Sequence, residues 1–431
     1  MSDAQLSCRR NNLKSLFAPL GRIFSAKNWA LRELAARLLL VTFSLVSAEV
    51  IMQLVSWYSL TAKRYLAAPW EVNRITVPDE RLIYRGNRLR FDHDAWGYRN
   101  AGRPSAVDIV TLGDSMTYGP SDPLEAWPPA LSRLTGRTIY NMALPGYGPA
   151  QSLLQLEEAF SLRPRQLVVT LYFGNDFFDS FLLARRHPKL MESISPKLKA
   201  AAETLEVQQP LAEVVNFVNI EVQDSPGEVS VLRRWLSEHL KLYGLLRALR
   251  NRFNDAAELP PLLSGRFNVA AAALSAEQRQ NASPFDSRGW RTILTAPYRG
   301  RAEDDRDPRI RLGFEVSRQA LVVISERCRA AGVRLLVALI PTKENVFSRR
   351  VSGLDDYPGL QRLLEDEERL KRELIAQLRS HGVAYLDLLE ALQSASAQPY
   401  PEDIDGHPNA IGYRIIASQI AAGLTERPAH H

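Results

Sequence analysis

Residues 166–173 read QLVVTLYF, and the sequence Gly174-Asn175-Asp176 follows directly. A continuous apolar run of this length is typical of a strand that is buried on both faces, as the strands of parallel sheets are. Residues 333–340, VRLLVALI, form a second run of this kind. Working outward from these two runs, we predict three shorter strands, at residues 108–112, 138–141 and 383–388.

Helical patterns separate the predicted strands. They cover residues 127–134, 150–160, 312–331, 359–380 and 410–424. Alternation of strand and helix predicts parallel βαβ units, and therefore an α/β fold in which three α/β/α layers are built on a parallel sheet. In such sheets, sites form beyond the carboxyl ends of the strands. The residues that follow each strand are therefore the first candidates for function.

The composition is that of an ordinary globular protein: of 431 residues, 45% are hydrophobic and 24% are charged. The net charge of +6 does not indicate nucleic-acid binding, because it is confined to the first 64 residues. These hold nine Lys or Arg and three Asp or Glu, which leaves 45 residues of each sign for the rest of the chain. A neutral body without a basic patch argues against a nucleic-acid partner.

Residues 38–60 read LLLVTFSLVSAEVIMQLVSWYSL, and this stretch is long enough to span a bilayer. Seven Lys or Arg precede it, whereas only Lys63 and Arg64 follow closely. The positive-inside rule then predicts a single-pass protein of the cell inner membrane, with its body on the periplasmic or extracellular side. A cleaved signal peptide is the alternative, since Val46-Ser47-Ala48 has the small residues of a cleavage site. The apolar run continues past that site, which favours an uncleaved anchor.

Glu49 is the one charged residue of the predicted anchor. Thr42, Gln53 and Ser56 share a polar stripe with it at helical spacing. An ionisable residue inside a membrane segment is expensive and is a functional hypothesis by default. Two interpretations stay open: Glu49 and Gln53 bind a partner membrane protein, or Glu49 is protonated and bonded within its own helix or a homodimer.

The chain divides into five predicted parts. Residues 1–37 are a cytoplasmic basic tail, 38–60 the transmembrane anchor and 61–106 a covering arm, while 107–185 together with 311–425 form the α/β domain and 186–310 an inserted helical cap. Within the insertion, residues 229–253 have the pattern of one amphipathic helix. This helix would either pack on the core or form a lid near the membrane surface.

Four short segments occur in a fixed order and follow predicted strands or precede a predicted helix. They are GDSMTYG at 113–119, NMALPGYG at 141–148, GND at 174–176 and DGHPNAIGY at 405–413. Together they supply a hydroxyl nucleophile, donors for an oxyanion, and a histidine with a carboxylate partner, which is what serine ester chemistry needs. The four segments resemble the sequence blocks of the SGNH/GDSL hydrolase family. The resemblance covers about residues 107–185 and 311–425, and it implies a flavodoxin-like sheet.

Ser115 is the predicted nucleophile, on the turn after the first strand. His407 is the predicted base, because imidazole titrates near neutral pH and can take the serine proton. The carboxylate that orients the ring is less obvious. Proteins similar to this one usually carry it three residues before the histidine, where this chain has Ile404. Asp405 is preferred because the Asp-Gly-His spacing also resembles some family members, and Asp403 is the alternative.

Three groups are predicted to form the oxyanion hole: the backbone N–H of Ser115, the backbone N–H of Gly146 and the side-chain amide of Asn175. Lys343 follows the strand at 333–340 and so falls on the same side of the sheet. It would bind a substrate carboxylate or sugar hydroxyl, or else form a surface salt bridge. This chemistry requires no metal or organic cofactor, and none is predicted.

The sequence therefore predicts an exported, membrane-anchored serine hydrolase that forms an acyl-enzyme on Ser115. O-acetyl or other acyl esters, with acetylated polysaccharide implied by the resemblance, are the expected substrates. Three alternatives stay open: a carbohydrate O-acetyltransferase that works with a membrane partner, a lipase or thioesterase, and an inactive glycan-binding or assembly subunit.

Overall fold

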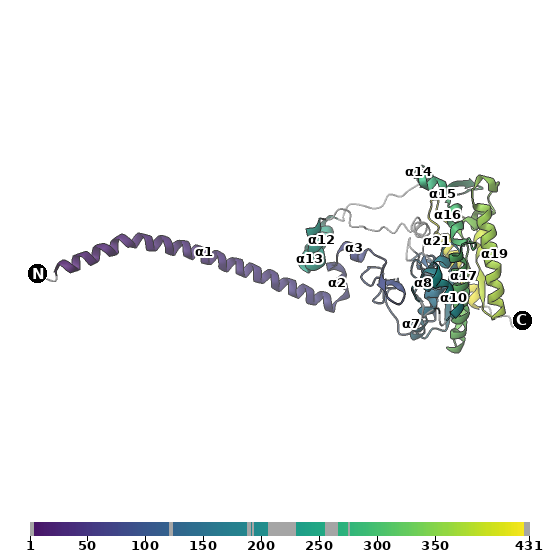
Figure 1. The fold of residues 1–431 in the computed structure, drawn as a ribbon, viewed down its shortest axis with the longest axis horizontal. Coiled ribbons are helices and arrows are strands. Elements are labelled where there is room, and N and C mark those ends of the chain that lie inside the picture. Colours follow the sequence, from purple (N-terminus) through teal and green to yellow (C-terminus); the bar gives the residue numbers. More distant parts are fainter. Residues whose placement is uncertain are drawn as a thin grey trace. The chain divides into compact units, whose positions relative to one another are not determined.

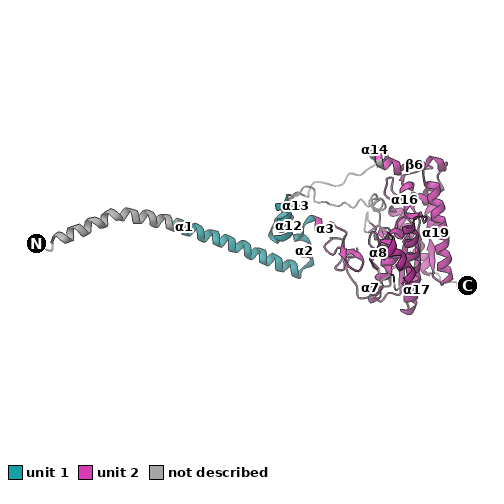
Figure 2. Cartoon of the chain, viewed as in Figure 1, with its two compact units in different colours: residues 1–69, 228–258 teal, residues 70–227, 259–431 magenta. Residues whose placement is uncertain are grey.

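The computed structural model describes residues 4–119, 124–187, 191, 194–205, 230–254, 266–274 and 276–425. These fall into two compact units, which Figure 2 colours separately. Unit 1 comprises residues 1–69 and 228–258, and unit 2 comprises residues 70–227 and 259–431. Each unit is described by itself.

Unit 2 is built on a five-stranded sheet in the order β4-β3-β5-β8-β9. The strands are β3 (Ile109–Leu112), β4 (Ile139–Asn141), β5 (Gln166–Tyr172), β8 (Arg334–Ile340) and β9 (Tyr385–Asp387). Every neighbouring pair is parallel. Numbered along the chain, the order is 2-1-3-4-5, the doubly wound order of flavodoxin-like sheets. All five predicted strands are present, and the predicted α/β fold class is confirmed.

Helices cover both faces of this sheet, because alternate side chains of each strand point to opposite sides. Leu167, Val169 and Leu171 of β5 belong to one hydrophobic core, and Val168 belongs to the other. On the first side α8 (Asp176–Arg186) packs on α17 (Pro308–Ala330), and on the second α5 (Trp127–Thr135) packs on α21 (Ala410–Thr425). Figure 1 labels α8, α17 and α21 among these elements. The three-layer arrangement follows from this two-sided burial.

Smaller elements complete unit 2. Two antiparallel hairpins stand apart from the main sheet, β1 (Thr76–Asp79) with β2 (Ile83–Gly86), and β6 (Ser283–Ser287) with β7 (Trp290–Leu294). The predicted helix at 150–160 is in fact two helices, interrupted at Gln155. Further helices among the described residues are α3 (Pro69–Val72), which crosses the boundary between the units, and α4 (Ser115–Tyr118), α6 (Pro149–Leu154), α7 (Leu156–Ser161), α10 (Pro196–Thr204), α14 (Arg266–Ala273), α15 (Ala276–Asn281), α16 (Ala296–Glu303), α18 (Lys343–Ser348), α19 (Leu360–Ser380) and α20 (Leu389–Gln393), with a 3-10 turn at Leu354–Asp356.

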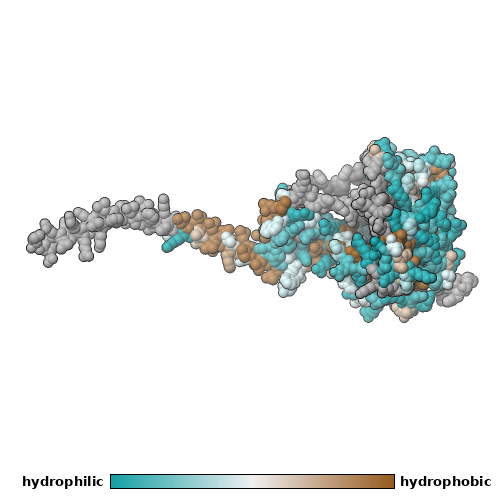
Figure 3. Space-filling model, viewed as in Figure 1, coloured by the Kyte–Doolittle hydropathy of each residue, from teal (hydrophilic) through white to brown (hydrophobic). Residues whose placement is uncertain are grey.

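Unit 1 contains the long helix α1 (Ala4–Tyr58) and α2 (Leu60–Leu66). Within α1, the segment Leu31–Tyr58 is long and apolar enough to cross a membrane, and its most apolar part is not buried in the protein. Figure 3 shows hydrophobic side chains along the described part of this helix. Length and composition thus agree with an anchor at this end of the chain.

The predicted single helix at 229–253 is wrong. The structure has α12 (Val231–His239) and α13 (Lys241–Asn254), with Leu240 between them in an extended conformation. The physical cause is Glu49, whose two carboxylate oxygens accept the N–H groups of Lys241 and Leu242, each at 2.8 Å. The first N–H groups of a helix have no partner within it, so a carboxylate there stabilises a new helix start. Residues 206–229 and 255–265 of the predicted cap lie outside the described residues.

Candidate active site

Ser115 begins the short helix α4, three residues after Leu112, the last residue of β3. Gly113 makes this turn possible: its φ is +149°, and a Cβ there would lie 1.9 Å from the Thr170 hydroxyl. Asp114 caps the helix, since its Oδ1 accepts the N–H of Met116 at 3.0 Å. The serine is therefore held on a tight turn at the carboxyl end of a central strand.

His407 connects Ser115 to a carboxylate. Its Nε2 lies 2.8 Å from the Ser115 hydroxyl oxygen, and its Nδ1 lies 2.6 Å from Oδ1 of Asp405. The same Asp405 oxygen also accepts the backbone N–H of His407 at 3.0 Å. A carboxylate at Nδ1 favours the tautomer with the proton there, which leaves Nε2 free to accept the serine proton. Burial alone would raise the pKa of Asp405, but hydrogen bonding and charge from His407 lower it to about 2.

Asp403, the alternative carboxylate, has a different position. Its Oδ1 accepts the N–H of Asp405 at 2.9 Å, and its carbonyl oxygen accepts the N–H of Ile293 at 3.2 Å. Both contacts shape the loop that carries Asp405. Of the two aspartates that the sequence left open, Asp405 is the one hydrogen-bonded to the imidazole.

Lys343 is neither a surface residue nor free to bind a substrate, so both interpretations drawn from the sequence are wrong. The side chain is fully buried. Its ammonium donates to the carbonyl oxygens of Ile293 at 2.9 Å, Asp403 at 3.1 Å and Asp405 at 2.9 Å. An ammonium has three N–H donors, and these carbonyls use all of them. Lys343 thus fixes the loop that presents Asp405 and His407.

The three predicted oxyanion donors follow adjacent strands. Ser115 follows β3, Gly146 follows its neighbour β4, and Asn175 follows β5 on the other side. Parallel strands end at one edge of the sheet, so the three residues belong to the same edge. Asn175 Nδ2 donates one hydrogen to Oδ2 of Asp179 at 2.5 Å. An amide nitrogen carries two hydrogens, so this bond sets the rotamer and leaves the second hydrogen for a ligand.

Tyr84 supports Gly146, and the sequence did not point to it. Its hydroxyl lies 2.7 Å from the Gly146 carbonyl oxygen and 3.0 Å from that of Pro145. In a trans peptide the carbonyl and the N–H point to opposite sides. A Pro145 carbonyl directed at Tyr84 therefore turns the Gly146 N–H away from this tyrosine. Ile83, just before Tyr84, has φ +74°, and such strain in a β-branched residue persists only where the surroundings impose it.

Arg299 of α16 is a second residue that the sequence did not indicate. It is 5% exposed, and its Nη1 donates to the Gly174 carbonyl oxygen at 3.4 Å. A Cβ at position 406 would lie 2.6 Å from its Nη2, so a larger residue in the Asp-Gly-His turn would require this guanidinium to move. Arg299 lies in the predicted insertion, outside the four motifs, which is why sequence patterns could not assign it.

Replacing Tyr84 by phenylalanine is expected to lower kcat for ester hydrolysis roughly tenfold to a hundredfold, with KM little changed. The loss is smaller than the 10²–10³-fold typical of deleting an oxyanion donor, because the Gly146 N–H remains but loses its fixed direction. The measurement compares each ester with its thionoester, whose sulfur accepts hydrogen bonds poorly. The ester-to-thionoester rate ratio should fall in Tyr84→Phe. Tyr98→Phe, in the same arm, is the control and should keep the wild-type ratio; an unchanged ratio in both variants would contradict the role of Tyr84.

Buried carboxyl groups should make the folded protein more stable in mild acid than at higher pH. Burial raises the pKa of Asp179 to about 8 and that of Glu367 to about 7, whereas an unfolded chain has values of roughly 4. At a pH between the unfolded and the folded pKa of each group, the folded state holds a proton that the unfolded state has released. The free energy of unfolding therefore falls as the pH rises, by up to about 1.4 kcal/mol per unit and group. Asp405, with its lowered pKa, has the opposite effect only below about pH 4.

Thermal unfolding at pH 5 and pH 8 checks this expectation. Asp179→Asn should reduce the loss of Tm across this range, because the new side chain stays neutral and can still accept the Asn175 hydrogen bond. An equal loss in wild type and variant would show that Asp179 does not retain its proton.

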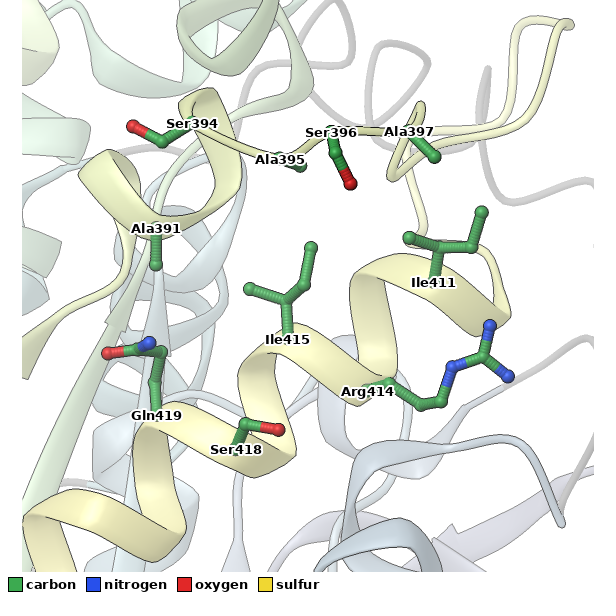
Figure 4. Close-up of a pocket in the computed structure, with 10 residues that line it drawn as sticks. All are labelled: Ala391, Ser394, Ala395, Ser396, Ala397, Ile411, Arg414, Ile415, Ser418 and Gln419. Atoms are coloured by element: carbon green, nitrogen blue, oxygen red, sulfur yellow. The ribbon is translucent and has the colours of Figure 1, made fainter.

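Figure 4 shows a pocket of about 510 Å³ beside α21. It contains none of the residues discussed above. Its lining residues are Ala391, Ser394, Ala395, Ser396, Ala397, Ile411, Arg414, Ile415, Ser418 and Gln419.

Among the residues that the structure describes, no group of three His, Cys, Asp or Glu side chains is arranged to hold a metal ion.

No protein-family model matches the sequence, and no curated protein is found to be similar to it. Several solved structures are similar to this chain. One is described as a lipolytic protein of the G-D-S-L family from Desulfitobacterium hafniense, with 9% identity, a TM-score of 0.34 and coverage of 73% of this chain and 98% of that chain. A GDSL-like lipase from Bacteroides thetaiotaomicron has 10% identity, a TM-score of 0.31 and coverage of 73% and 86%. A mutant of an acetyl-xylooligosaccharide esterase from Geobacillus has 8% identity, a TM-score of 0.32 and coverage of 76% and 99%. The four motifs and the hydrogen bonds from Ser115 through His407 to Asp405 define the candidate site.

Proposed function

We propose that this protein is a serine hydrolase of the SGNH type that cleaves acyl esters through an acyl-enzyme on Ser115. One observation carries the proposal: the continuous hydrogen-bonded series from the Ser115 hydroxyl through His407 to Asp405, at 2.8 and 2.6 Å. A nucleophile bonded to a base, and a base oriented by a third group, is the arrangement that activates a serine hydroxyl. Lys343 and Asp403 support the arrangement by holding the loop of His407.

The reaction proceeds in two halves. His407 Nε2 takes the Ser115 proton while the serine oxygen bonds to the ester carbonyl carbon, and the carbonyl oxygen gains negative charge. The N–H groups of Ser115 and Gly146 and the Asn175 amide stabilise that charge. His407 then returns the proton to the departing alcohol as the carbon–oxygen bond breaks. Water, deprotonated by His407, attacks the acyl-enzyme, and the acid leaves as Ser115 regains its proton.

The proposed location is the outer side of a cell inner membrane, with α1 as a single-pass anchor. The apolar segment Leu31–Tyr58 supports the anchor, and the excess of Lys and Arg before it supports a cytoplasmic N-terminus. An enzyme held there would meet exported or envelope material. O-acetyl groups on polysaccharide are the substrate class that we propose.

The alternative of an inactive binding subunit drew on two features of the sequence, the displaced aspartate and the polar stripe at Glu49. Asp405 is hydrogen-bonded to His407, and Glu49 is bonded to the start of α13. Neither feature therefore still favours a binding subunit. The partner membrane protein suggested for Glu49 and Gln53 loses its main support for the same reason.

Hydrolysis of p-nitrophenyl esters with acyl chains of two to twelve carbons tests the proposal, using the purified full-length protein. We expect turnover with a preference for the acetyl ester, and labelling of Ser115 by a fluorophosphonate. A preference for long chains would favour a lipase or thioesterase. Acyl transfer to a sugar hydroxyl in place of water would favour an O-acetyltransferase. Absence of both turnover and labelling would contradict the proposal.

A further inference from the structure

The guanidinium of Arg299 lies between two turns of the candidate site. Its Nη1 donates to the Gly174 carbonyl oxygen at 3.4 Å, and a Cβ added at Gly406 would lie 2.6 Å from its Nη2. Gly174 directly precedes Asn175, the proposed oxyanion donor. Gly406 directly precedes His407, the proposed base. One side chain therefore adjoins both the turn proposed to stabilise negative charge and the turn proposed to move the proton.

The helix that carries Arg299, α16, is itself fixed to the surroundings of the site. Thr295, which precedes this helix, donates its N–H and its hydroxyl to Oε1 of Glu344 at 2.7 and 3.0 Å. In the strand before it, β7, Ile293 donates its N–H to the Asp403 carbonyl oxygen at 3.2 Å. These bonds hold the backbone of Arg299 in place relative to the loop of the proposed base.

Packing does not account for a charged group at this place. Arg299 is nearly fully buried, and its Nε has no hydrogen-bond partner among the described residues. Within the same part of the chain, both oxygens of Glu303 and Oε2 of Glu344 also lack one. Burial by itself would lower the pKa of Arg299, but interactions with Tyr172, Tyr298 and Glu344 raise it, so the guanidinium stays charged. A methionine would fill similar space without the cost of burying a charge. A cation that is kept in spite of this cost indicates a role in the adjoining site.

The bond from Arg299 fixes the peptide between Gly174 and Asn175. In a trans peptide the carbonyl and the N–H point to opposite sides, so a Gly174 carbonyl directed at Arg299 sets the direction of the Asn175 N–H. The backbone from which the Asn175 amide extends is thereby held in one orientation. On the other side, the close approach of Nη2 to Gly406 limits how near the turn of His407 can come. One planar group thus separates the two turns.

We propose that Arg299 is a positioning residue of the ester reaction, which sets the distance between the oxyanion donor Asn175 and the base His407. The inference rests on the proposed function and adds a residue to it. Catalytic groups must be held within about 0.5 Å of their productive geometry, and a misplacement of about 1 Å can cost roughly 10²-fold in rate. Arginine suits this role better than lysine. Its planar fork directs two nitrogens to two partners, whereas an ammonium is a compact charge on a flexible stem.

Kinetics of Arg299 variants in the purified full-length protein test the proposal. Arg299→Lys keeps the positive charge near Glu344. In this variant we expect kcat for p-nitrophenyl acetate to fall roughly tenfold to a hundredfold, with KM little changed. The rate ratio between this ester and its thionoester should also fall, because the ratio reports the alignment of the oxyanion donors. Both rates come from one sample, so the ratio does not depend on the fraction of protein that is folded. Arg301→Lys is the matched control: this exposed arginine of α16 bonds Asn281, and its variant should keep the wild-type kcat and ratio.

Arg299→Met, which also removes the charge, should lose about 10²-fold in kcat or more and show the same fall in the ratio. If circular dichroism shows that this variant does not fold, the result for Arg299→Lys decides. A wild-type kcat in Arg299→Lys would overturn the proposal, and so would a lower kcat with an unchanged ratio. A raised KM with unchanged kcat would also overturn it, because that is the sign of a side chain that binds substrate. Wild-type protein with neither turnover nor fluorophosphonate labelling would instead overturn the proposed function, and this proposal with it.

Discussion

Replacing Ser115 by alanine is expected to lower kcat/KM for p-nitrophenyl acetate by about 10⁴-fold or more, to a rate near that of background hydrolysis. Alanine cannot form the acyl-enzyme, and His407 then has no hydroxyl from which to take a proton. The Ser115 oxygen lies 2.8 Å from His407 Nε2, so the loss should be in kcat, whereas KM reports contacts that alanine leaves in place. Initial rates and fluorophosphonate labelling followed by mass spectrometry measure the two consequences.

Ser161→Ala is the matched control, because this serine is exposed at the end of α7 and bonds the Glu158 carbonyl oxygen. It should keep the wild-type rate and the wild-type label. If Ser115→Ala kept its activity while remaining folded, the nucleophile would have to be another residue. The hydrogen bond to His407 would then have no catalytic role.

The second large loss of activity is expected for only one of the two aspartates near His407. Asp405→Asn is expected to lower kcat by about 10³–10⁴-fold, because an amide at this position can hold the imidazole in the wrong tautomer. Asp403→Asn should change kcat by less than about tenfold, since an asparagine oxygen can still accept the N–H of Asp405. Steady-state kinetics of both variants, with circular dichroism to show that each is folded, provide the test.

One result with these two variants would contradict the assignment of Asp405 as the partner of His407. If Asp403→Asn lost more activity than Asp405→Asn, the carboxylate that serves His407 would be the alternative one. The loop would then have to rearrange during catalysis, because Asp403 Oδ1 bonds a backbone N–H in this structure.

Several features of the fold were predictable because local sequence encodes them. A strand such as β5, covered by helices on both faces, is apolar along most of its length, so it can be recognised in the sequence without knowing its neighbours. The positions of Ser115 and Asn175 were predictable for a related reason. Parallel strands bring their carboxyl ends to one edge, so residues that follow the strands share that edge even when they are far apart in the chain.

Helix α13 shows where this reasoning fails. The apolar periodicity of residues 229–253 continues through Leu240, so the pattern predicts one helix. The break depends on Glu49, which is 192 residues away from Lys241. No local pattern contains such a partner, and the same holds for Tyr84, which reaches Gly146 over 62 residues.

The sequence by itself determined the class of fold, the apolar helix near the N-terminus and the residues Ser115, Asn175 and His407 at their places in the chain. The tertiary structure alone decided that Asp405 rather than Asp403 bonds His407. It also decided that Lys343 is buried under the loop of His407, and that Tyr84 directs the peptide before Gly146. The physical reason is that apolar periodicity and turn motifs act over a few residues. The partner of a polar group, in contrast, is set by the packing of distant segments, because each buried donor and acceptor must find a partner there.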